Sequence, residues 1–383
     1  MLRVGMFSPY SLSIPGGVQN QVMALARTLR ATGIEVRVLG PCDGPPPATF
    51  VTPLGNSLPT AANGSIAPLA PDPSASLRTI RAMIDEQFDV LHLHEPYAPG
   101  PTMTALVMRS APIVATFHAA GHSSSYELLS PLIRRWGAGN ITHQVVVSED
   151  ALKLVTTAVP GEYELLYNGI ELQRYRSAEP YPTDGPTIFF CGRHEERKGL
   201  DVLLQAMPQL GPDVRLWVAG SGPDSDRLRT AYGGDARVEW LGQVSDDDKF
   251  RRLRGADVFC APSLRGESFG VVLIEAMAAG TTVVASALDG YRNVATDGVD
   301  ALLVEPGDAD ALADALNRVL GDPTLAARLR ASGDRRAGDF SMDRLAARYA
   351  EIYAEIADDR ERLPAWRMQA SLLRRRLTRM MTR

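Results

Sequence analysis

The chain has 383 residues, of which 45% are hydrophobic and 22% are charged, and its formal net charge at pH 7 is −5. This composition is ordinary for a soluble globular protein, and the length predicts two domains. The acidic balance argues against a nucleic-acid partner. Three scattered cysteines argue against a disulfide framework or a zinc site and favour a reducing compartment.

The N-terminal segment predicts a βαβ unit. Residues 2–7 form an apolar run that is typical of a buried strand and not of a signal peptide. After the loop SPYSLSIPGG, residues 18–30 repeat apolar side chains at helical spacing, and residues 34–39 read as the next strand. Gly16 and Gly17 stand where the backbone can approach a ligand at the helix N-terminus, although tight turns also need glycine pairs.

Later strands of the first half end in polar residues. Predicted strands at 89–94 and 112–117 lead to His94, Glu95 and His118. Strands that alternate with helices predict a parallel sheet, in which ligands bind at the carboxyl ends of the strands. A single histidine at such an end is usually structural, but two of them favour a functional site.

A second α/β half starts at residue 187. The first loop of this half, GRHEERKG, contains Arg193 and Lys198, which can clamp a diphosphate; a solvated charged turn is the alternative. Lys198 is notable because the chain has only three lysines. The later GSGPDS segment lacks the third glycine of a dinucleotide fingerprint, which disfavours a dehydrogenase.

Residues 257–286 predict a strand, a loop, a helix, a turn and a strand. The helix is apolar nearly all round and is therefore expected to be buried, so that Glu275 in its middle needs a partner. Ser268 is the expected N-cap, Gly270 permits close approach to the backbone, and the free N–H groups of the first turn offer an anion site. Glu267 stands just before the helix, and carboxylates suit sugar hydroxyls. A buried helix with one ion-paired glutamate is the plainer alternative for Glu275 alone.

The segment ESFGVVLIEAMAAG resembles the Glu-x7-Glu signature of the family 4 retaining glycosyltransferases, which have the GT-B fold. The resemblance extends to residue 358 and includes the segments PYSLSIPGGVQ, HLHEP, VATFH, YNG and GRHEERKG. It implies an α/β chain with two Rossmann-like domains whose parallel sheets face across a cleft. Within the family, the motifs are most similar to those of the actinobacterial phosphatidylinositol α-mannosyltransferases, which use GDP-mannose and need no metal. No cofactor is expected.

The resemblance implies three sets of site residues. The catalytic set is His118, Arg193, Lys198 and Glu267. The donor-binding set is Gly16, Gly17, Arg193, Lys198, Val244, Glu267, Ser268, Phe269, Gly270 and Glu275. The acceptor-binding set is Tyr10, Gly17, Asn63, Ser65 and His118. In these sets the two cations neutralise the departing diphosphate, Glu267 binds donor sugar hydroxyls, Glu275 binds the ribose, and the Val244 backbone contacts the base.

The expected organisation has five parts. They are an acceptor domain (1–172), a linker (173–186), a donor domain (187–340), a helix that crosses back to the first domain (341–358), and a basic amphipathic tail (359–383). In the tail, residues 365–383 place apolar side chains on one helical face and arginines beside them. This pattern predicts contact with an anionic membrane surface; docking on an acidic patch of the protein, or disorder, are the alternatives. The expected location is the cytoplasm, at the inner face of the plasma membrane.

Three departures weaken the lipid acceptor but leave the donor residues intact. The early helix carries only Arg78 and Arg81 where the similar enzymes have a basic run, Pro68 stands where an arginine is expected, and Ala119 stands where threonine is usual. One alternative is therefore transfer from another nucleotide sugar to a soluble acceptor, such as an inositol phosphate, a sugar or a secondary metabolite. A sugar-nucleotide epimerase and a catalytically inactive membrane adaptor are further alternatives.

Overall fold

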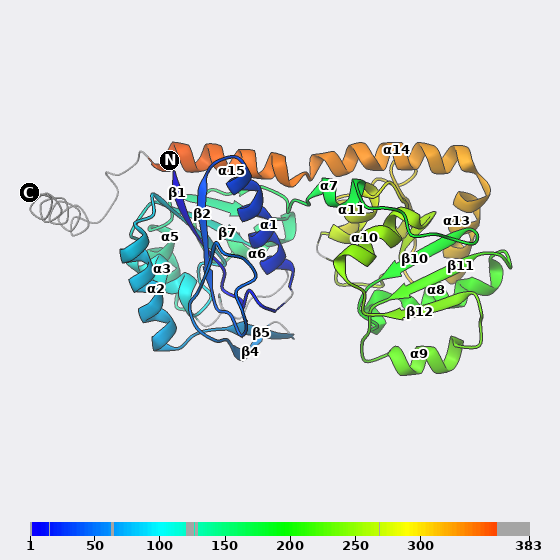
Figure 1. Cartoon of the computed structure of the whole chain (residues 1–383), viewed down its shortest axis with the longest axis horizontal. Coiled ribbons are helices and arrows are strands. Elements are labelled where there is room, and N and C mark those ends of the chain that lie inside the picture. Colours follow the sequence, from blue (N-terminus) through cyan, green and yellow to red (C-terminus); the bar gives the residue numbers. More distant parts are fainter. Residues whose placement is uncertain are drawn as a thin grey trace, which may run out of the picture. The chain divides into compact units, whose positions relative to one another are not determined.

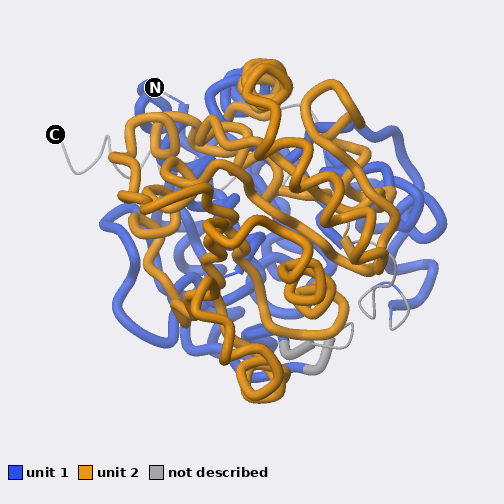
Figure 2. The backbone as a smooth tube through the Cα atoms, turned by 90° about the vertical axis from the view of Figure 1, so that its right-hand side faces the viewer, with its two compact units in different colours: residues 1–169, 342–383 blue, residues 170–341 orange. Residues whose placement is uncertain are grey.

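The computed structural model describes residues 2–14, 16–62, 65–119, 126, 129–267 and 269–357, without the side chains of residues 61, 62, 65 and 66. The chain forms two compact units (Figures 1 and 2). Unit 1 comprises residues 1–169 and 342–383, and unit 2 comprises residues 170–341. Each unit is built on a parallel sheet with helices on its faces, which confirms the predicted fold class of two Rossmann-like domains.

The sheet of unit 1 has seven strands in the order β3-β2-β1-β6-β7-β8-β9, and all neighbouring strands in it are parallel. A separate antiparallel pair is formed by β4 and β5. The elements of this unit are β1 (Arg3–Phe7), α1 (Gly17–Ala31), β2 (Glu35–Gly40), β3 (Val51–Pro53), β4 (Leu58–Ala62), β5 (Ser65–Leu69), α2 (Pro73–Glu86), β6 (Val90–His94), α3 (Pro101–Met108), β7 (Ile113–Phe117), α5 (Pro131–Ala138), β8 (His143–Val146), α6 (Glu149–Thr156), β9 (Glu164–Leu165) and α15 (Met342–Ala357).

Both faces of the unit 1 sheet are buried, because successive strand residues point to opposite sides. On β6, Val90 belongs to the apolar cluster that faces α1 and α15, whereas Leu91 and Leu93 belong to the cluster on the other face. Figure 1 shows α15 beside α1, although the two helices are far apart in the sequence. The buried residues of α15 recur every three or four positions and include Tyr349 and Tyr353. Helix α15 is thus part of the unit 1 core.

The sheet of unit 2 has six parallel strands in the order β12-β11-β10-β13-β14-β15. The strand order reverses between β10 and β13, and the carboxyl ends of strands at such a switch point form a natural ligand site. The elements are α7 (Leu172–Arg176), β10 (Thr187–Cys191), the 3₁₀ turn η1 (Glu196–Lys198), α8 (Leu200–Ala206), the 3₁₀ turn η2 (Met207–Gln209), β11 (Arg215–Ala219), α9 (Ser225–Tyr232), β12 (Val238–Gly242), α10 (Asp246–Gly255), β13 (Val258–Ala261), α11 (Val271–Ala278), β14 (Thr282–Ser286), α12 (Asp289–Arg292), β15 (Leu302–Val304), α13 (Ala309–Gly321) and α14 (Pro323–Asp339).

The segment 173–186, which the sequence predicts as a linker, is attached to unit 2. Its first residues lie in α7, which contacts α10 and α11. Further along, the guanidinium carbon of Arg252 lies 4.0 Å from the centre of the Tyr181 ring and 4.8 Å from that of Trp217. This buried cation lies beside both rings, which also meet each other edge to face at 5.4 Å, and these contacts hold the segment against the sheet. The proline and glycine content of the segment suggested a loop, but its attachment depends on residues from distant elements.

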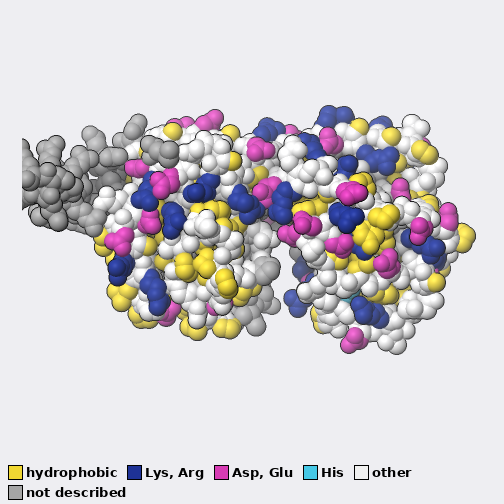
Figure 3. Space-filling model, viewed as in Figure 1, with side chains coloured by type: hydrophobic (Ala, Val, Ile, Leu, Met, Phe, Trp, Pro, Cys, Tyr) yellow, Lys and Arg dark blue, Asp and Glu magenta, His cyan; other side chains and the backbone are white. Residues whose placement is uncertain are grey.

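Basic and acidic side chains are interspersed on the face of the molecule that Figure 3 shows, in keeping with the small net charge. Among the residues that the structure describes, no helix is long and apolar enough to cross a membrane. The predicted membrane-binding tail lies outside the described residues.

Candidate functional site

Two loops meet at the switch point of unit 2, one after β10 and one after β13. Lys198, at the end of η1, donates to the Oε1 atom of Glu267 over 2.5 Å. The next residue, Gly199, has a φ of +65°, and a Cβ atom there would collide with the carbonyl oxygen of Pro262. Glycine therefore permits the close approach of the two loops that joins the lysine to the glutamate.

Glu267 has further partners that fix its orientation. Ser263 Oγ donates to Oε1 of Glu267 over 3.0 Å and also lies 3.0 Å from the hydroxyl of Tyr291. Arg197 Nη1 is 3.6 Å from the same carboxylate oxygen. The side chains of Lys198 and Glu267 are only 19% and 11% exposed. The switch point thus carries an oriented carboxylate, suited to hydroxyl groups, beside two cations suited to phosphate.

Arg193 does not contact Glu267 in this structure. Its side chain is 67% exposed, and its Nε atom lies 3.5 Å from Glu195. Glu195 is also bound by Arg197, over 2.6 Å. The sequence favoured Arg193 over Arg197, because a charged turn does not show which of its side chains lies against the next loop.

The helix after Glu267 begins later than the sequence predicts. Ser268 was the expected N-cap and lies outside the described residues, but α11 starts at Val271 with Gly270 as its cap, so this prediction is wrong. Gly270 has a φ of +87°, and a Cβ atom there would lie 2.9 Å from the ring of Tyr291. The left-handed cap turns the chain into the helix without a side-chain acceptor, and of the first-turn N–H groups that of Leu273 donates to the carbonyl oxygen of Gly270.

Glu275 has the partners that a buried carboxylate requires. Its Oε1 atom accepts from the hydroxyl of Tyr175 over 2.7 Å and from Nζ of Lys249 over 2.9 Å. Burial is the largest influence on Lys249 and disfavours its charge, but the charge and hydrogen bond of Glu275 outweigh it and raise the lysine pKa. Burial, reinforced by Glu275, also raises the pKa of Tyr175. The sequence did not indicate Tyr175 as a partner of Glu275. Lys249 could have been selected, because the chain has only three lysines.

The remaining donor candidates of unit 2 lie in different surroundings. Val244 is half-buried in the loop between β12 and α10. Phe269 is buried and its ring lies 5.5 Å from that of Phe340, edge to face. Phe269 therefore helps to anchor the loop before α11.

The GSGPDS segment has a structural use. Cβ atoms at Gly220 and Gly222 would collide with the carbonyl oxygens of Gly192 and His194. These glycines let the loop after β11 lie against the loop after β10, which supports the backbone that leads to Lys198.

A stack of three histidines lies at the carboxyl ends of β6 and β7 in unit 1. His94 Nδ1 and His118 Nε2 are 2.9 Å apart, and the rings of His92, His94 and His118 are stacked in sequence. His92 is hydrogen-bonded to Tyr353 and Thr116, which ties the stack to α15. Burial lowers the pKa of His118 to about 4 and, with a smaller contribution from His118, that of His92 to about 3. The stack is therefore neutral near pH 7, and His118, which is half-buried, presents a neutral imidazole.

Glu95 holds the backbone of His118 in place. Its carboxylate accepts the N–H groups of His118 and Ala119 over 2.5 and 2.6 Å and the hydroxyl of Tyr126 over 3.2 Å. Its own φ is 50°, a left-handed conformation that is uncommon outside glycine and that often marks functional sites. The sequence placed Glu95 at this strand end but did not indicate what its carboxylate binds.

The acceptor candidates of unit 1 are described only in part. Tyr10 packs against the cluster of Ala67, Leu69 and Ala98, and burial together with the nearby charge of Glu95 raises its pKa. Gly16 is the cap of α1, where a Cβ atom would collide with the side chain of Gln19, whereas a Cβ atom at Gly17 would meet nothing within 4 Å. Asn63 and the side chain of Ser65 lie outside the described residues.

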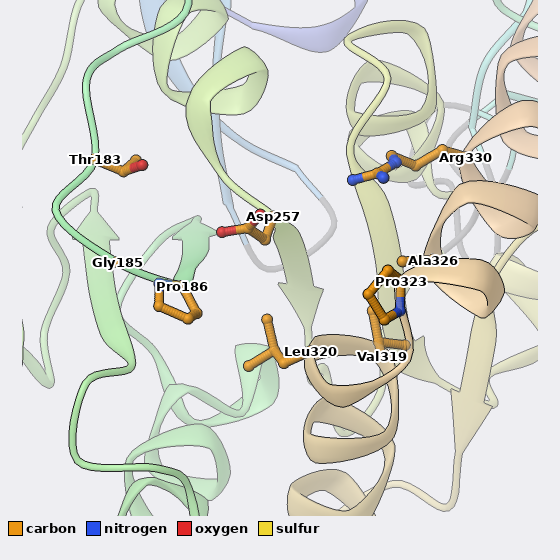
Figure 4. A pocket seen from close by; sticks show the side chains of 9 residues that line it. All are labelled: Thr183, Gly185, Pro186, Asp257, Val319, Leu320, Pro323, Ala326 and Arg330. Atoms are coloured by element: carbon orange, nitrogen blue, oxygen red, sulfur yellow. The ribbon is translucent and has the colours of Figure 1, made fainter.

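One cavity of about 470 Å³ lies elsewhere on unit 2 (Figure 4). Its lining includes Asp257 and Arg330, which point toward it from different elements. Asp257 precedes β13, so the cavity is at the amino end of that strand, away from Lys198 and Glu267. We do not assign it to the candidate site. Within the described ranges, no group of three or more His, Cys, Asp or Glu residues is arranged to hold a metal ion.

Comparison with known proteins decides the family. The model of glycosyltransferase family 4 matches residues 15–174, and that of the group 1 glycosyl transferases matches residues 173–336. A phosphatidyl-myo-inositol mannosyltransferase of Mycobacterium leprae is 41% identical over 368 residues, which cover 93% of this chain and 97% of the relative. The chain belongs to glycosyltransferase family 4.

Other comparisons agree with this assignment. The phosphatidyl-myo-inositol mannosyltransferase of Mycolicibacterium smegmatis is 39% identical to this glycosyltransferase over 366 residues, which cover 93% of this chain and 94% of the relative. Among solved structures, a sucrose-phosphate synthase from Thermosynechococcus elongatus matches with a TM-score of 0.72 and 22% identity, and the match covers 93% of this chain and 99% of that chain. At this identity the structural match supports the GT-B fold alone. The predicted family and fold are confirmed.

Proposed function

We propose that this glycosyltransferase moves mannose from GDP-mannose to phosphatidylinositol or a related lipid, with retention of anomeric configuration. The observation that carries the proposal is the contact between Lys198 and Glu267 at the switch point of unit 2. It combines a cation for a diphosphate with a carboxylate for sugar hydroxyls, and these two groups are adjacent in a nucleotide-sugar donor. The identity to relatives named phosphatidyl-myo-inositol mannosyltransferases supports the choice of sugar and acceptor.

In this proposal unit 2 is the donor domain. Arg193 and Lys198 neutralise the departing diphosphate, together with the N–H groups of the first turn of α11 near Gly270. Glu267 binds hydroxyls of the mannose and Glu275 binds the ribose. The backbone of Val244 meets the base.

Unit 1 is the acceptor domain in this proposal. The backbone at Gly16 and Gly17 approaches the donor phosphates and the acceptor, and Tyr10 and His118 contact the acceptor. During transfer, the bond between the mannose C1 and the β-phosphate oxygen breaks. A bond from C1 to the acceptor oxygen forms on the same face, and the acceptor proton passes to the leaving diphosphate. The neutral His118 can donate or accept a hydrogen bond but is not required as a nucleophile.

The proposed place of action is the cytoplasmic membrane face, where the basic tail at residues 365–383 would bind anionic lipid. The proposed reaction needs no metal ion. Addition of a chelator should therefore leave the rate of turnover unchanged.

The test is release of GDP from GDP-mannose with and without phosphatidylinositol vesicles, followed by analysis of the lipid product. We expect release that depends on phosphatidylinositol and yields an α-mannosylated lipid, with the anomeric configuration read by NMR. GDP release that does not depend on the vesicles would refute the lipid acceptor, and absence of GDP-mannose binding would refute the donor assignment. UDP-glucose in place of GDP-mannose serves as the control for donor specificity.

A second candidate is transfer to a soluble acceptor such as an inositol phosphate. Pro68, which stands where a phosphate-binding arginine is expected, is a residue of β5, and its carbonyl oxygen accepts from Ser11 N over 3.0 Å. A proline ring offers no charge to a lipid phosphate. The same GDP-release assay with free inositol phosphate in place of vesicles separates the two candidates.

A further inference from the structure

Both hydrogen-bond donors of Glu275 bind the same carboxylate oxygen. Tyr175 Oη and Lys249 Nζ both approach Oε1, over 2.7 and 2.9 Å. No described residue donates to the other oxygen, Oε2, and the Glu275 side chain is 14% exposed. The carboxylate is thus held from one side and presents one free acceptor.

Tyr175 is itself held firmly. It is 6% exposed, and its ring meets that of Phe250 edge to face at 4.6 Å. Its helix, α7, lies against α10, which carries Lys249, and against α11, which carries Glu275. The hydroxyl is therefore fixed before any ligand arrives, and a fixed donor restricts rotation of the carboxylate about its terminal bond.

We propose that Tyr175 is a positioning residue that makes Glu275 selective for a ribose hydroxyl over a deoxyribose. Tyr175 is bound to Oε1, so it acts on the nucleotide only through the direction in which Oε2 points. An oriented acceptor distinguishes a ligand that has the hydroxyl from one that lacks it, because the analogue leaves a partly buried oxygen unpaired. This inference rests on the proposed function, since it places the nucleotide ribose at Glu275.

The experiment measures the affinity of the full chain for GDP, 2′-deoxy-GDP and 3′-deoxy-GDP by titration calorimetry. The wild type should prefer GDP to at least one deoxy analogue by about tenfold, the ratio that corresponds to one hydrogen bond to a charged group. Tyr175→Phe, which keeps the ring and removes only the hydroxyl, should lose most of this preference. Its affinity for the deoxy analogue should stay close to that of the wild type.

The matched control is Tyr232→Phe. Tyr232 also lies in unit 2, and its hydroxyl donates to Asp201 over 2.7 Å, so this variant removes an equivalent hydrogen bond away from Glu275. It should keep the wild-type preference. Glu275→Gln should lose the preference, and addition of Tyr175→Phe to it should cause no further change, because the tyrosine acts through the carboxylate.

The possible failures are distinguishable. If the wild type binds GDP without any preference for ribose hydroxyls, or if Tyr175→Phe keeps the preference, this inference is wrong while the proposed function stands. If Tyr175→Phe weakens GDP and both deoxy analogues by the same factor, the hydroxyl has only a structural role and the inference is also wrong. If the wild type binds neither GDP nor GDP-mannose, both the proposed function and this inference are wrong.

Discussion

Acidification should destabilise unit 1 through its buried histidines, and His92 shows why. It is completely buried, and burial lowers its pKa to about 3. A histidine in an unfolded chain has a pKa of about 6.5. Since the folded pKa is the lower one, the unfolded chain binds a proton first. The stability that His92 provides is therefore fully present above about pH 6.5 and is lost as the pH falls toward 3.

The expected size of the effect follows from these two pKa values. Each pH unit below 6.5 costs about 1.4 kcal/mol for one such group, so His92 alone removes about 2 kcal/mol of unfolding free energy at about pH 5. His94 and His118, which stack with it, have pKa values lowered in the same direction and add to the loss. Because a domain typically has only about 5–15 kcal/mol of stability, the effect should be easy to measure.

The assay is urea unfolding at about pH 7.5 and about pH 5, with hydrogen exchange at β6 and β7 as the reporter of unit 1. The matched variant is His92→Gln, which offers a donor and an acceptor to Tyr353 and Thr116 but does not titrate. Its loss of stability between the two pH values should be about 2 kcal/mol smaller than that of the wild type. Equal losses in the two proteins would refute the argument.

Three further changes test single contacts. Gly199→Ala puts a methyl group against the Pro262 carbonyl at a left-handed position, so urea unfolding of unit 2 should show a loss of about 1–3 kcal/mol; an unchanged midpoint would contradict the tight approach of the loops. Lys198→Ala removes the cation beside Glu267 and should lower kcat for transfer by about 100-fold or more, with circular dichroism as the check on folding. Arg252→Met removes a buried cation that lies beside the Tyr181 and Trp217 rings and pairs with Asp248, and it should lower the unfolding free energy by about 1–2 kcal/mol; a gain would mean that burial of the guanidinium costs more than its contacts provide.

Much of the fold could be predicted because the signals are local. Apolar strands followed by amphipathic helices indicate parallel sheets, and this pattern occurs twice along the chain. The carboxyl ends of β6, β7, β10 and β13 were also predictable, since a buried strand must end where polar residues begin. This argument led to His118 and Lys198 as candidates, while the resemblance to the Glu-x7-Glu signature led to Glu267. The cap of α11 was predicted wrongly, because Ser268 matches the usual preference while the backbone uses the left-handed freedom of Gly270.

The sequence by itself determined the fold class, the family resemblance and the chemical types of the site residues. Only the tertiary structure decided which side chains meet: Glu275 is bound by residues 26 and 100 positions away, and Arg197 lies beside Glu267 while Arg193 lies beside Glu195. Periodicity and capping report interactions within a few residues of one another. Contacts between distant elements depend instead on the order of the strands in the sheet and on the packing of helices such as α7 and α15. A local sequence pattern does not specify that arrangement.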